Sequence, residues 1–152
     1  MLTITPFLWF DTQAEDAMLF YTSIFPRSKC GPVKRAGGQV FGVEFEIEGQ
    51  QIFGMNSRPA QFGFNDSVSF FVGCESQQEI DTLWTKLTAD GGKPGRCGWL
   101  VDKFGLSWQI IPNELSTLLG GGGDGARAKR VLDAMLGMSK LDVAALKRAY
   151  DA

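Results

Sequence analysis

The stretch CGWLVDKFGLSWQIIP, residues 97–112, decides the fold. Residues 95–101 and 106–111 have the composition and spacing of two strands. Asp102-Lys103-Phe104-Gly105 joins them, with an acidic residue at the start of the turn and a glycine where positive φ is needed. We therefore predict a hairpin that closes a strand-rich pocket.

The residues before this hairpin predict a strand and a helix. Residues 68–74 form an apolar run typical of a strand, and Ser76 and Glu79 have the spacing of a capping box. The predicted helix carries an apolar stripe of Ile80, Leu83, Trp84 and Leu87. This part of the chain thus follows the order strand, helix, strands.

The first part of the chain repeats this order. Residues 3–10 predict a strand, Thr12 and Glu15 have capping-box spacing, and a helical stripe follows until Pro26. Residues 41–47 alternate between apolar and polar side chains, and Glu48-Gly49 turns the chain into residues 51–56. One such unit leaves a sheet face uncovered, so we expect two units that share a core or curve around a cleft.

The residues after the hairpin predict helices. A short helix over 113–119 is followed by the glycine run 120–123, and Asp124 and Asp142 are positioned to cap two further helices. Leu141 precedes the second cap and is placed to pack on Leu146. This C-terminal tail must bury its apolar stripe on its own domain or on a partner subunit.

Composition excludes several classes of protein. The chain of 152 residues has a net charge of −2 and no long run of one charge, so we expect no nucleic-acid partner. No apolar stretch is long enough to span a bilayer, and the amino terminus lacks a basic segment before its apolar residues. The three cysteines are widely spaced, which suits a reducing compartment. We expect a cytoplasmic protein without a membrane contact.

Recognisable catalytic or cofactor motifs are weak. The chain has no histidine, so the commonest general base and transition-metal ligand are missing, and Cys97 has no Cys-His pair to activate its thiol. Gly120, Gly122 and Gly125 match Gly-x-Gly-x-x-Gly, but a helix rather than a strand is predicted before them, which favours a linker over a nucleotide or methyl-donor site.

Two further sets of residues have alternative interpretations. Glu44, Glu46 and Glu48 could do acid-base chemistry or hold a hard cation, but charge at every second residue is typical of a solvated sheet face. Most of the aromatic residues must fill the core, and Trp99 and Phe104 are the best candidates for pocket walls because they lie near a turn.

A set of residues that runs from the first strand to the tail carries a family resemblance. It comprises PFLWFD at 6–11, Ala14-Glu15, Ala17-Met18, Phe20-Tyr21, Ile24-Phe25-Pro26, Ser28-Lys29, CGWL at 97–100, Asp102, GLSWQ at 105–109, Pro112, Leu141-Asp142, Ala144-Ala145-Leu146 and Arg148-Ala149-Tyr150. In these residues the chain resembles the PhnB-like proteins, also labelled demethylubiquinone methyltransferase-like, of the vicinal oxygen chelate (glyoxalase, bleomycin resistance, dioxygenase) superfamily.

The resemblance implies an α+β fold of two βαβββ modules that form a curved mixed sheet around a cleft, within a homodimer. We expect a single domain over 1–152, with modules at 1–60 and 61–112 and a helical tail at 113–152. The metal-ligand positions of the superfamily fall near Pro6, within 51–56, at Ser67 and at Gln109. These residue types are not transition-metal ligands, so we expect no metal and no cofactor.

Strand alternation places neutral hydrogen-bonding groups in the expected cleft. Its predicted lining is Ser67, Ser69, Trp99, Ser107 and Gln109. We therefore expect metal-independent binding of a small organic molecule, although Ser and Gln could merely satisfy one another in a filled cleft. Two alternatives stay open: an enzyme of unknown reaction that uses a carboxylate such as Glu44 or Asp102, and a dimeric assembly module whose residues 124–152 pack on a partner.

Overall fold

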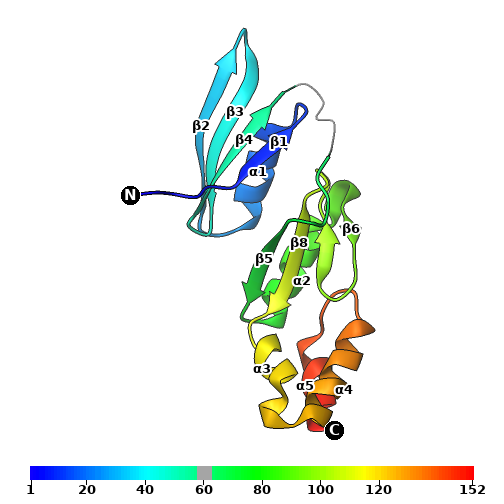
Figure 1. Cartoon of the computed structure of the whole chain (residues 1–152). Helices are drawn as coiled ribbons and strands as arrows, with labels where there is room; N and C mark the ends of the chain where they lie inside the picture. The colour runs from blue at the N-terminus through cyan, green and yellow to red at the C-terminus, as the bar shows by residue number, and fades with distance from the viewer. Residues whose placement is uncertain (58–62) are drawn as a thin grey trace. The chain divides into compact units, whose positions relative to one another are not determined.

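The computed structural model describes residues 1–57 and 63–152, which fold as two compact units, Met1–Gly63 and Phe64–Ala152 (Figure 1). Each unit has a four-stranded mixed sheet with a helix packed on one face. The predicted order of strand, helix and strands is therefore confirmed in both units. No helix in the described ranges has the length and hydropathy that a membrane span requires.

The first unit has the sheet order β1-β4-β3-β2, in which β1 is parallel to β4 and the other pairs are antiparallel. Its elements are β1 (Phe7–Phe10), α1 (Ala14–Ile24), β2 (Ser28–Ala36), β3 (Gln39–Ile47) and β4 (Gln50–Asn56). The apolar stripe of α1 is buried against the apolar face of β3, where the Tyr21 ring stacks 6.2 Å from that of Phe45. This packing leaves the other face of the sheet uncovered by α1.

The predicted capping box at the start of α1 is wrong. The N-cap residue is Gln13, which makes no side-chain capping bond, and the acceptor for Ala14 N–H is instead Asn56 Oδ1 at 2.8 Å. The amide nitrogen of Asn56 donates to the carbonyl oxygens of Thr12 and Val40. Asn56, at the end of β4, therefore takes the place of a local cap. Its side chain accepts from the first N–H group of the helix and donates to a carbonyl oxygen of the preceding loop.

The β3–β4 turn is confirmed at Glu48-Gly49, where both residues have positive φ, as a tight hairpin of this length requires. Strand β2, in contrast, escaped prediction. It contains Gly31 and Pro32, and its register with β3 shifts between Cys30 and Val33. These interruptions remove the alternating pattern by which a strand is recognised.

The second unit has the sheet order β5-β8-β7-β6, with β5 parallel to β8. Its sheet and covering helix comprise β5 (Ser69–Cys74), α2 (Gln77–Leu87), the 3-10 turn η1 (Ala89–Gly91), β6 (Lys93–Pro94), β7 (Trp99–Val101) and β8 (Ser107–Pro112). The Ser76 cap is confirmed, since its hydroxyl oxygen accepts from Glu79 N–H at 3.2 Å. The carboxylate of Glu79 accepts from Glu75 N–H rather than from Ser76.

The strand predicted over 95–101 is shorter than expected. Cys97 and Gly98 have positive φ, and their N–H groups donate to the carbonyl oxygens of Met138 and Ser139 in the tail. A Cβ on Gly98 would lie 2.7 Å from Ile111 Cδ1, so glycine is required here for space as well as for conformation. The tail thus takes the hydrogen bonds that a longer β7 would use.

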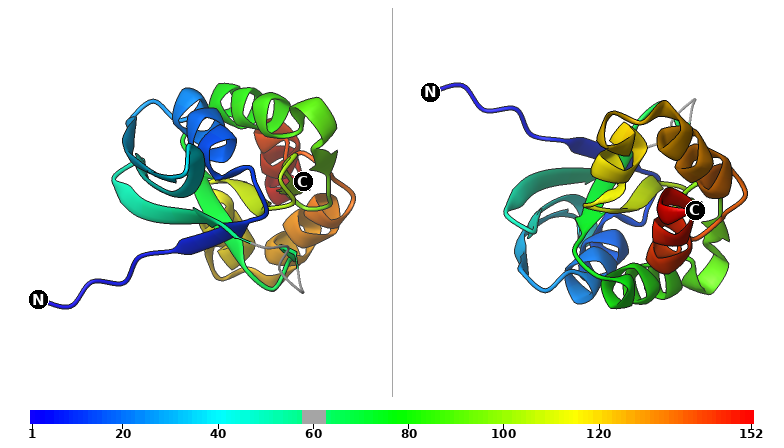
Figure 2. Two further views of the ribbon diagram at one scale, coloured as in Figure 1. Left: turned by 90° about the horizontal axis from the view of Figure 1, so that it is seen from above. Right: turned by 90° about the horizontal axis from the view of Figure 1, so that it is seen from below.

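The C-terminal tail buries its apolar stripe on the second unit itself. It consists of α3 (Leu115–Gly120), the 3-10 turn η2 (Gly121–Gly123), α4 (Gly125–Leu136) and α5 (Val143–Asp151), and Figure 2 shows α4 and α5 side by side. The predicted caps Asp124 and Asp142 are confirmed. We call the buried apolar set that joins the tail to β8 the tail cluster: Ile111, Leu115, Leu118, Val131, Leu141 and Leu146.

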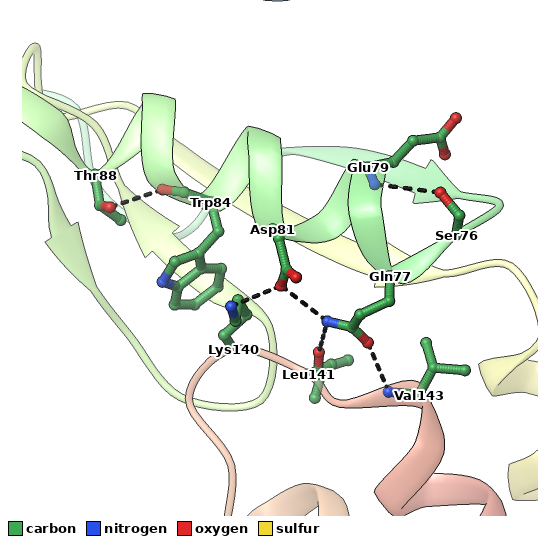
Figure 3. Close-up of polar contacts among 9 residues, drawn as sticks. All are labelled: Ser76, Gln77, Glu79, Asp81, Trp84, Thr88, Lys140, Leu141 and Val143. Atoms are coloured by element: carbon green, nitrogen blue, oxygen red, sulfur yellow. Dashed lines mark hydrogen bonds and ion pairs between the residues drawn. The ribbon is translucent and has the colours of Figure 1, made fainter.

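A glutamine side chain fastens the tail to α2 (Figure 3). The amide of Gln77 donates to Leu141 O at 3.1 Å and to Asp81 Oδ1 at 3.0 Å, and its oxygen accepts from Val143 N–H at 2.9 Å. Lys140 pairs with Asp81 at 2.6 Å. The hydrogen bonds from Lys140 and Gln77 hold the pKa of Asp81 below its usual value.

We expect Gln77→Ala to loosen the start of α5. The substitution leaves Leu141 O and Val143 N–H without their side-chain partner, which costs roughly 1–2 kcal/mol of unfolding free energy. Hydrogen exchange at the Val143 amide should accelerate more than exchange in β8. The matched control is Gln78→Ala, because Gln78 is exposed on the same helix; equal effects of both changes would contradict the role of Gln77.

Candidate functional site

The second sheet has one face that α2 does not cover. Leu100, Trp108 and Ile110 are almost fully buried on the α2 side. Strand alternation directs the intervening residues to the opposite side, and the register pairs Ser69 with Ser107, Phe71 with Gln109, and Trp99 with Gln109. We call this set, Ser69, Phe71, Trp99, Ser107 and Gln109, the Gln109 face.

A hydrogen bond between two neutral side chains lies at the centre of the Gln109 face. Gln109 Nε2 donates to Ser69 Oγ at 2.9 Å, between the adjacent strands β8 and β5. Because Ser69 Oγ is the acceptor, its own hydrogen is free to be donated in another direction. Gln109 Oε1 accepts no hydrogen bond from residues 1–57 and 63–152. The pair therefore offers a donor and an acceptor without a charge.

Aromatic side chains flank this pair. Phe71 is 64% exposed, and Trp99 is half-buried on the other side of Gln109. Phe104, the other predicted wall residue, is half-buried in the β7–β8 turn, with the Lys103 ammonium 5.5 Å from its ring centroid. A face with flat apolar groups around a few polar atoms has the chemistry of a small-molecule site.

The residues predicted from the sequence are placed as follows. Ser69, Trp99, Ser107 and Gln109 lie together on the Gln109 face, with Ser107 almost fully buried. Ser67 lies in the turn before β5, outside the strand, and its N–H donates to Asn65 Oδ1 at 2.9 Å.

The first unit has an aromatic face that was not predicted as part of a site. Phe7 and Trp9 of β1 are about half exposed, and they pair in register with Phe53 and Met55 of β4. The alternation of Phe7 and Trp9 with the buried Leu8 and Phe10 is the sequence pattern from which this face could have been predicted. This face lies opposite to α1 within its own unit.

The three alternating glutamates, Glu44, Glu46 and Glu48, are ion-paired. Glu44 and Glu46 on β3 contact Lys34 and Lys29 on β2 at 2.6 and 3.0 Å, and Glu48 contacts Arg27 at 2.7 Å. The first two pairs join neighbouring strands, and the third joins the β3–β4 turn to the residue before β2. Partly exposed ion pairs of this kind stabilise a sheet edge modestly. Their geometry supports the interpretation as a solvated surface.

Asp102 has a structural role in the β7–β8 turn. The carboxylate is 2% exposed and accepts from Phe104 N–H at 2.8 Å, from Leu106 N–H at 3.1 Å and from the indole N–H of Trp108 at 2.8 Å. All three donors belong to the same unit as Asp102. Asp102 thus fixes the turn and the orientation of β8, the strand that carries Gln109.

The cysteines differ in exposure and reactivity. Burial, with a smaller contribution from the negative charge of Glu79, raises the pKa of the Cys74 thiol to about 11. Cys30 is exposed, and Cys97 is half-buried. Cys74 is thus a core residue.

We expect the thiols to react with iodoacetamide in the order of exposure. Because the thiolate is the nucleophile, raising the pKa of Cys74 from 9.0 to about 11 lowers its thiolate fraction near neutral pH by roughly a hundredfold. Peptide mass spectrometry should find Cys30 modified first and Cys74 protected until the pH approaches 11 or the protein unfolds. Modification of Cys74 at the rate of Cys30 would contradict this assignment.

The Gln109 face does not suit a transition metal. Its polar groups are an amide and hydroxyls, whereas such ions prefer imidazole, thiolate or carboxylate ligands. In the described ranges, no three Cys, Asp or Glu residues are grouped to hold a metal. The superfamily metal site therefore has no fitting ligand set on this face.

The glycine-rich segment does not suit a methyl-donor cofactor either. It follows α3 rather than a strand: Gly120 ends α3, Gly122 lies in the turn η2, and Gly125 begins α4. Asp124 already accepts from the N–H groups of Ala126 and Arg127 at the start of α4. The doubly wound sheet on which such cofactors sit is absent from the described residues.

Comparison with known proteins identifies relatives of the chain. A family model described as 3-demethylubiquinone-9 3-methyltransferase matches residues 2–111, so the match stops before the tail. A Bacillus cereus protein named for this methyltransferase and for PhnB is 35% identical, with a TM-score of 0.69, covering 73% of this chain and 99% of its own. The comparison with curated protein sequences gave no match.

Two more distant structures share the fold. Protein PA1353 from Pseudomonas aeruginosa is 16% identical, with a TM-score of 0.62 and coverage of 74% of this chain and 98% of its own. The fosfomycin resistance protein FosX from Listeria monocytogenes, in a complex with Mn(II) and sulfate, is 16% identical, with a TM-score of 0.53 and coverage of 72% and 92%. At this identity the likeness concerns the fold.

Proposed function

The chain belongs to the 3-demethylubiquinone-9 3-methyltransferase (PhnB-like) family of the vicinal oxygen chelate superfamily, and from this premise we propose that it binds a small, uncharged, partly apolar organic molecule without a metal ion. The observation that carries the proposal is the hydrogen bond between Gln109 and Ser69. This pair is flanked by the exposed ring of Phe71 and the half-buried ring of Trp99. The binding site is the Gln109 face.

The chemistry of this pair selects the ligand class. A ligand carbonyl can accept from the Ser69 hydroxyl, and a ligand N–H or O–H can donate to Gln109 Oε1. No charged side chain belongs to the face, so an ionic ligand would lose hydration without gaining a counter-charge. A flat body would pack on Phe71 and Trp99.

We also propose that the chain forms the homodimer that the resemblance implies. Sedimentation of the purified protein would test the homodimer, and a monomer at all concentrations would contradict that part of the proposal.

We expect benzamide to bind better than benzoate or benzylamine, which have the same ring but carry a charge. In NMR titrations, the side-chain amide of Gln109 and the indole N–H of Trp99 should shift with benzamide. Gln109→Ala should weaken this binding roughly three- to tenfold, the value of one neutral hydrogen bond. Gln78→Ala, on the exposed surface of α2, should leave it unchanged. Tighter binding of either charged probe would contradict the proposed ligand class.

A further inference from the structure

We infer that the C-terminal tail forms an end wall of the Gln109 face and so limits the length of the ligand. This inference rests on the proposed function, and it assigns a specificity role to Ile111 and Asn113. The family match stops at residue 111, and 73% of this chain suffices to cover 99% of the B. cereus relative. Ile111 is therefore the last residue that the family model matches, and the rest of the wall, from Asn113 onward, lies beyond the matched part of the chain.

The Gln109 face is built of successive rows of paired residues. Ser69 and Ser107 form one row, and Phe71 and Gln109 form the next. Two residues further along the same strands, Gly73 is paired with Ile111. Strand alternation directs this third row to the same side as Gln109.

The tail buries the third row on β8, and on β5 it borders this row with the exposed side chain of Asn113. Ile111 is buried in the tail cluster with Leu115, Leu118 and Leu141. On the neighbouring strand, a Cβ on Gly73 would collide with Asn113 Oδ1, so the Asn113 side chain occupies the place of a side chain at Gly73. Figure 1 shows α3 continuing from the end of β8. A ligand on Gln109 therefore meets the tail directly beyond it in this direction.

The test compares a short probe with two extended ones. Benzamide, biphenyl-3-carboxamide and biphenyl-4-carboxamide share the carboxamide, and the added ring points in two different directions. The intact protein should prefer benzamide. Ile111→Ala and Asn113→Gly should each reduce this preference, for at least one biphenyl, by roughly tenfold, which is the scale of discrimination by pocket size. Leu132→Ala, an exposed tail residue outside the tail cluster, is the control and should not change it.

The outcomes separate this inference from the proposed function. If benzamide binds and neither variant changes the preference, the end wall is refuted and the binding site stands. If no probe binds, the proposed function fails and the end wall fails with it. Asn113→Gly retains the backbone hydrogen bond from residue 113 to Cys74 O, so it keeps the test valid if Ile111→Ala does not fold.

Discussion

Asp102→Ala is expected to lower the free energy of unfolding by about 3–5 kcal/mol, because it leaves buried donors without an acceptor. This loss is a large share of the total stability of a domain. Urea denaturation followed by tryptophan fluorescence would measure it. The matched control, Asp133→Ala, removes an exposed carboxylate from the ion pair with Lys129 and should cost little.

Asp102→Asn separates the hydrogen bonds of Asp102 within the turn from its hydrogen bond to Trp108. Its amide oxygen can still accept from Phe104 N–H and Leu106 N–H, but its NH₂ group would face the indole N–H of Trp108. We therefore expect an intermediate loss of stability, which Trp108→Phe should partly relieve in the double variant. Full stability of both Asp102 variants, together with loss of a catalysed reaction, would instead support Asp102 as a catalytic carboxylate.

Leu146→Ala is expected to destabilise the second unit by about 2–5 kcal/mol, because the fully buried side chain leaves a cavity in the tail cluster. Leu136→Ala is the matched control, since Leu136 is a tail leucine that is 48% exposed. Chemical denaturation of the two variants gives the difference directly. Equal stability of both would show that the tail does not stabilise this unit.

The same pair of variants tests the tail as an assembly module. The tail cluster is buried within its own unit, so we expect Leu146→Ala to change the stability of the fold rather than the oligomeric state. If Leu136→Ala dissociated an oligomer while leaving the unfolding free energy intact, the exposed surface of α4 would be an interface. That outcome would favour the assembly hypothesis for residues 124–152.

Local patterns predicted the elements whose hydrogen bonds are local. The Ser76, Asp124 and Asp142 caps accept bonds from residues within the first turn of their own helices, so the spacing alone revealed them. The start of α1 depends on Asn56, which is distant in sequence. In the strand predicted over 95–101, residues 97 and 98 do not join β7, because their N–H groups donate to the carbonyl oxygens of residues 138 and 139. Both errors arise where a tertiary contact replaces the local one.

In the candidate site, too, the sequence predicted what depends on local patterns and missed what depends on tertiary contacts. Alternation along β5 and β8 is enough to place Ser69 and Gln109 on one face. Sequence could not reveal that they bond to each other, because this depends on the register between strands far apart in the chain. Nor could it reveal that Asn113 fills the space above Gly73, since the path of the tail is set by the tail cluster.

Metal-independent binding at Gln109 is tested most directly by one calorimetric titration. Benzamide is titrated into the purified protein in the presence of EDTA, and the titration is repeated with Mn(II) and with Zn(II) after the chelator is removed. The account predicts the same dissociation constant in all three, and weaker binding by Gln109→Ala in each. Binding that disappears with EDTA and returns with a metal ion would contradict it.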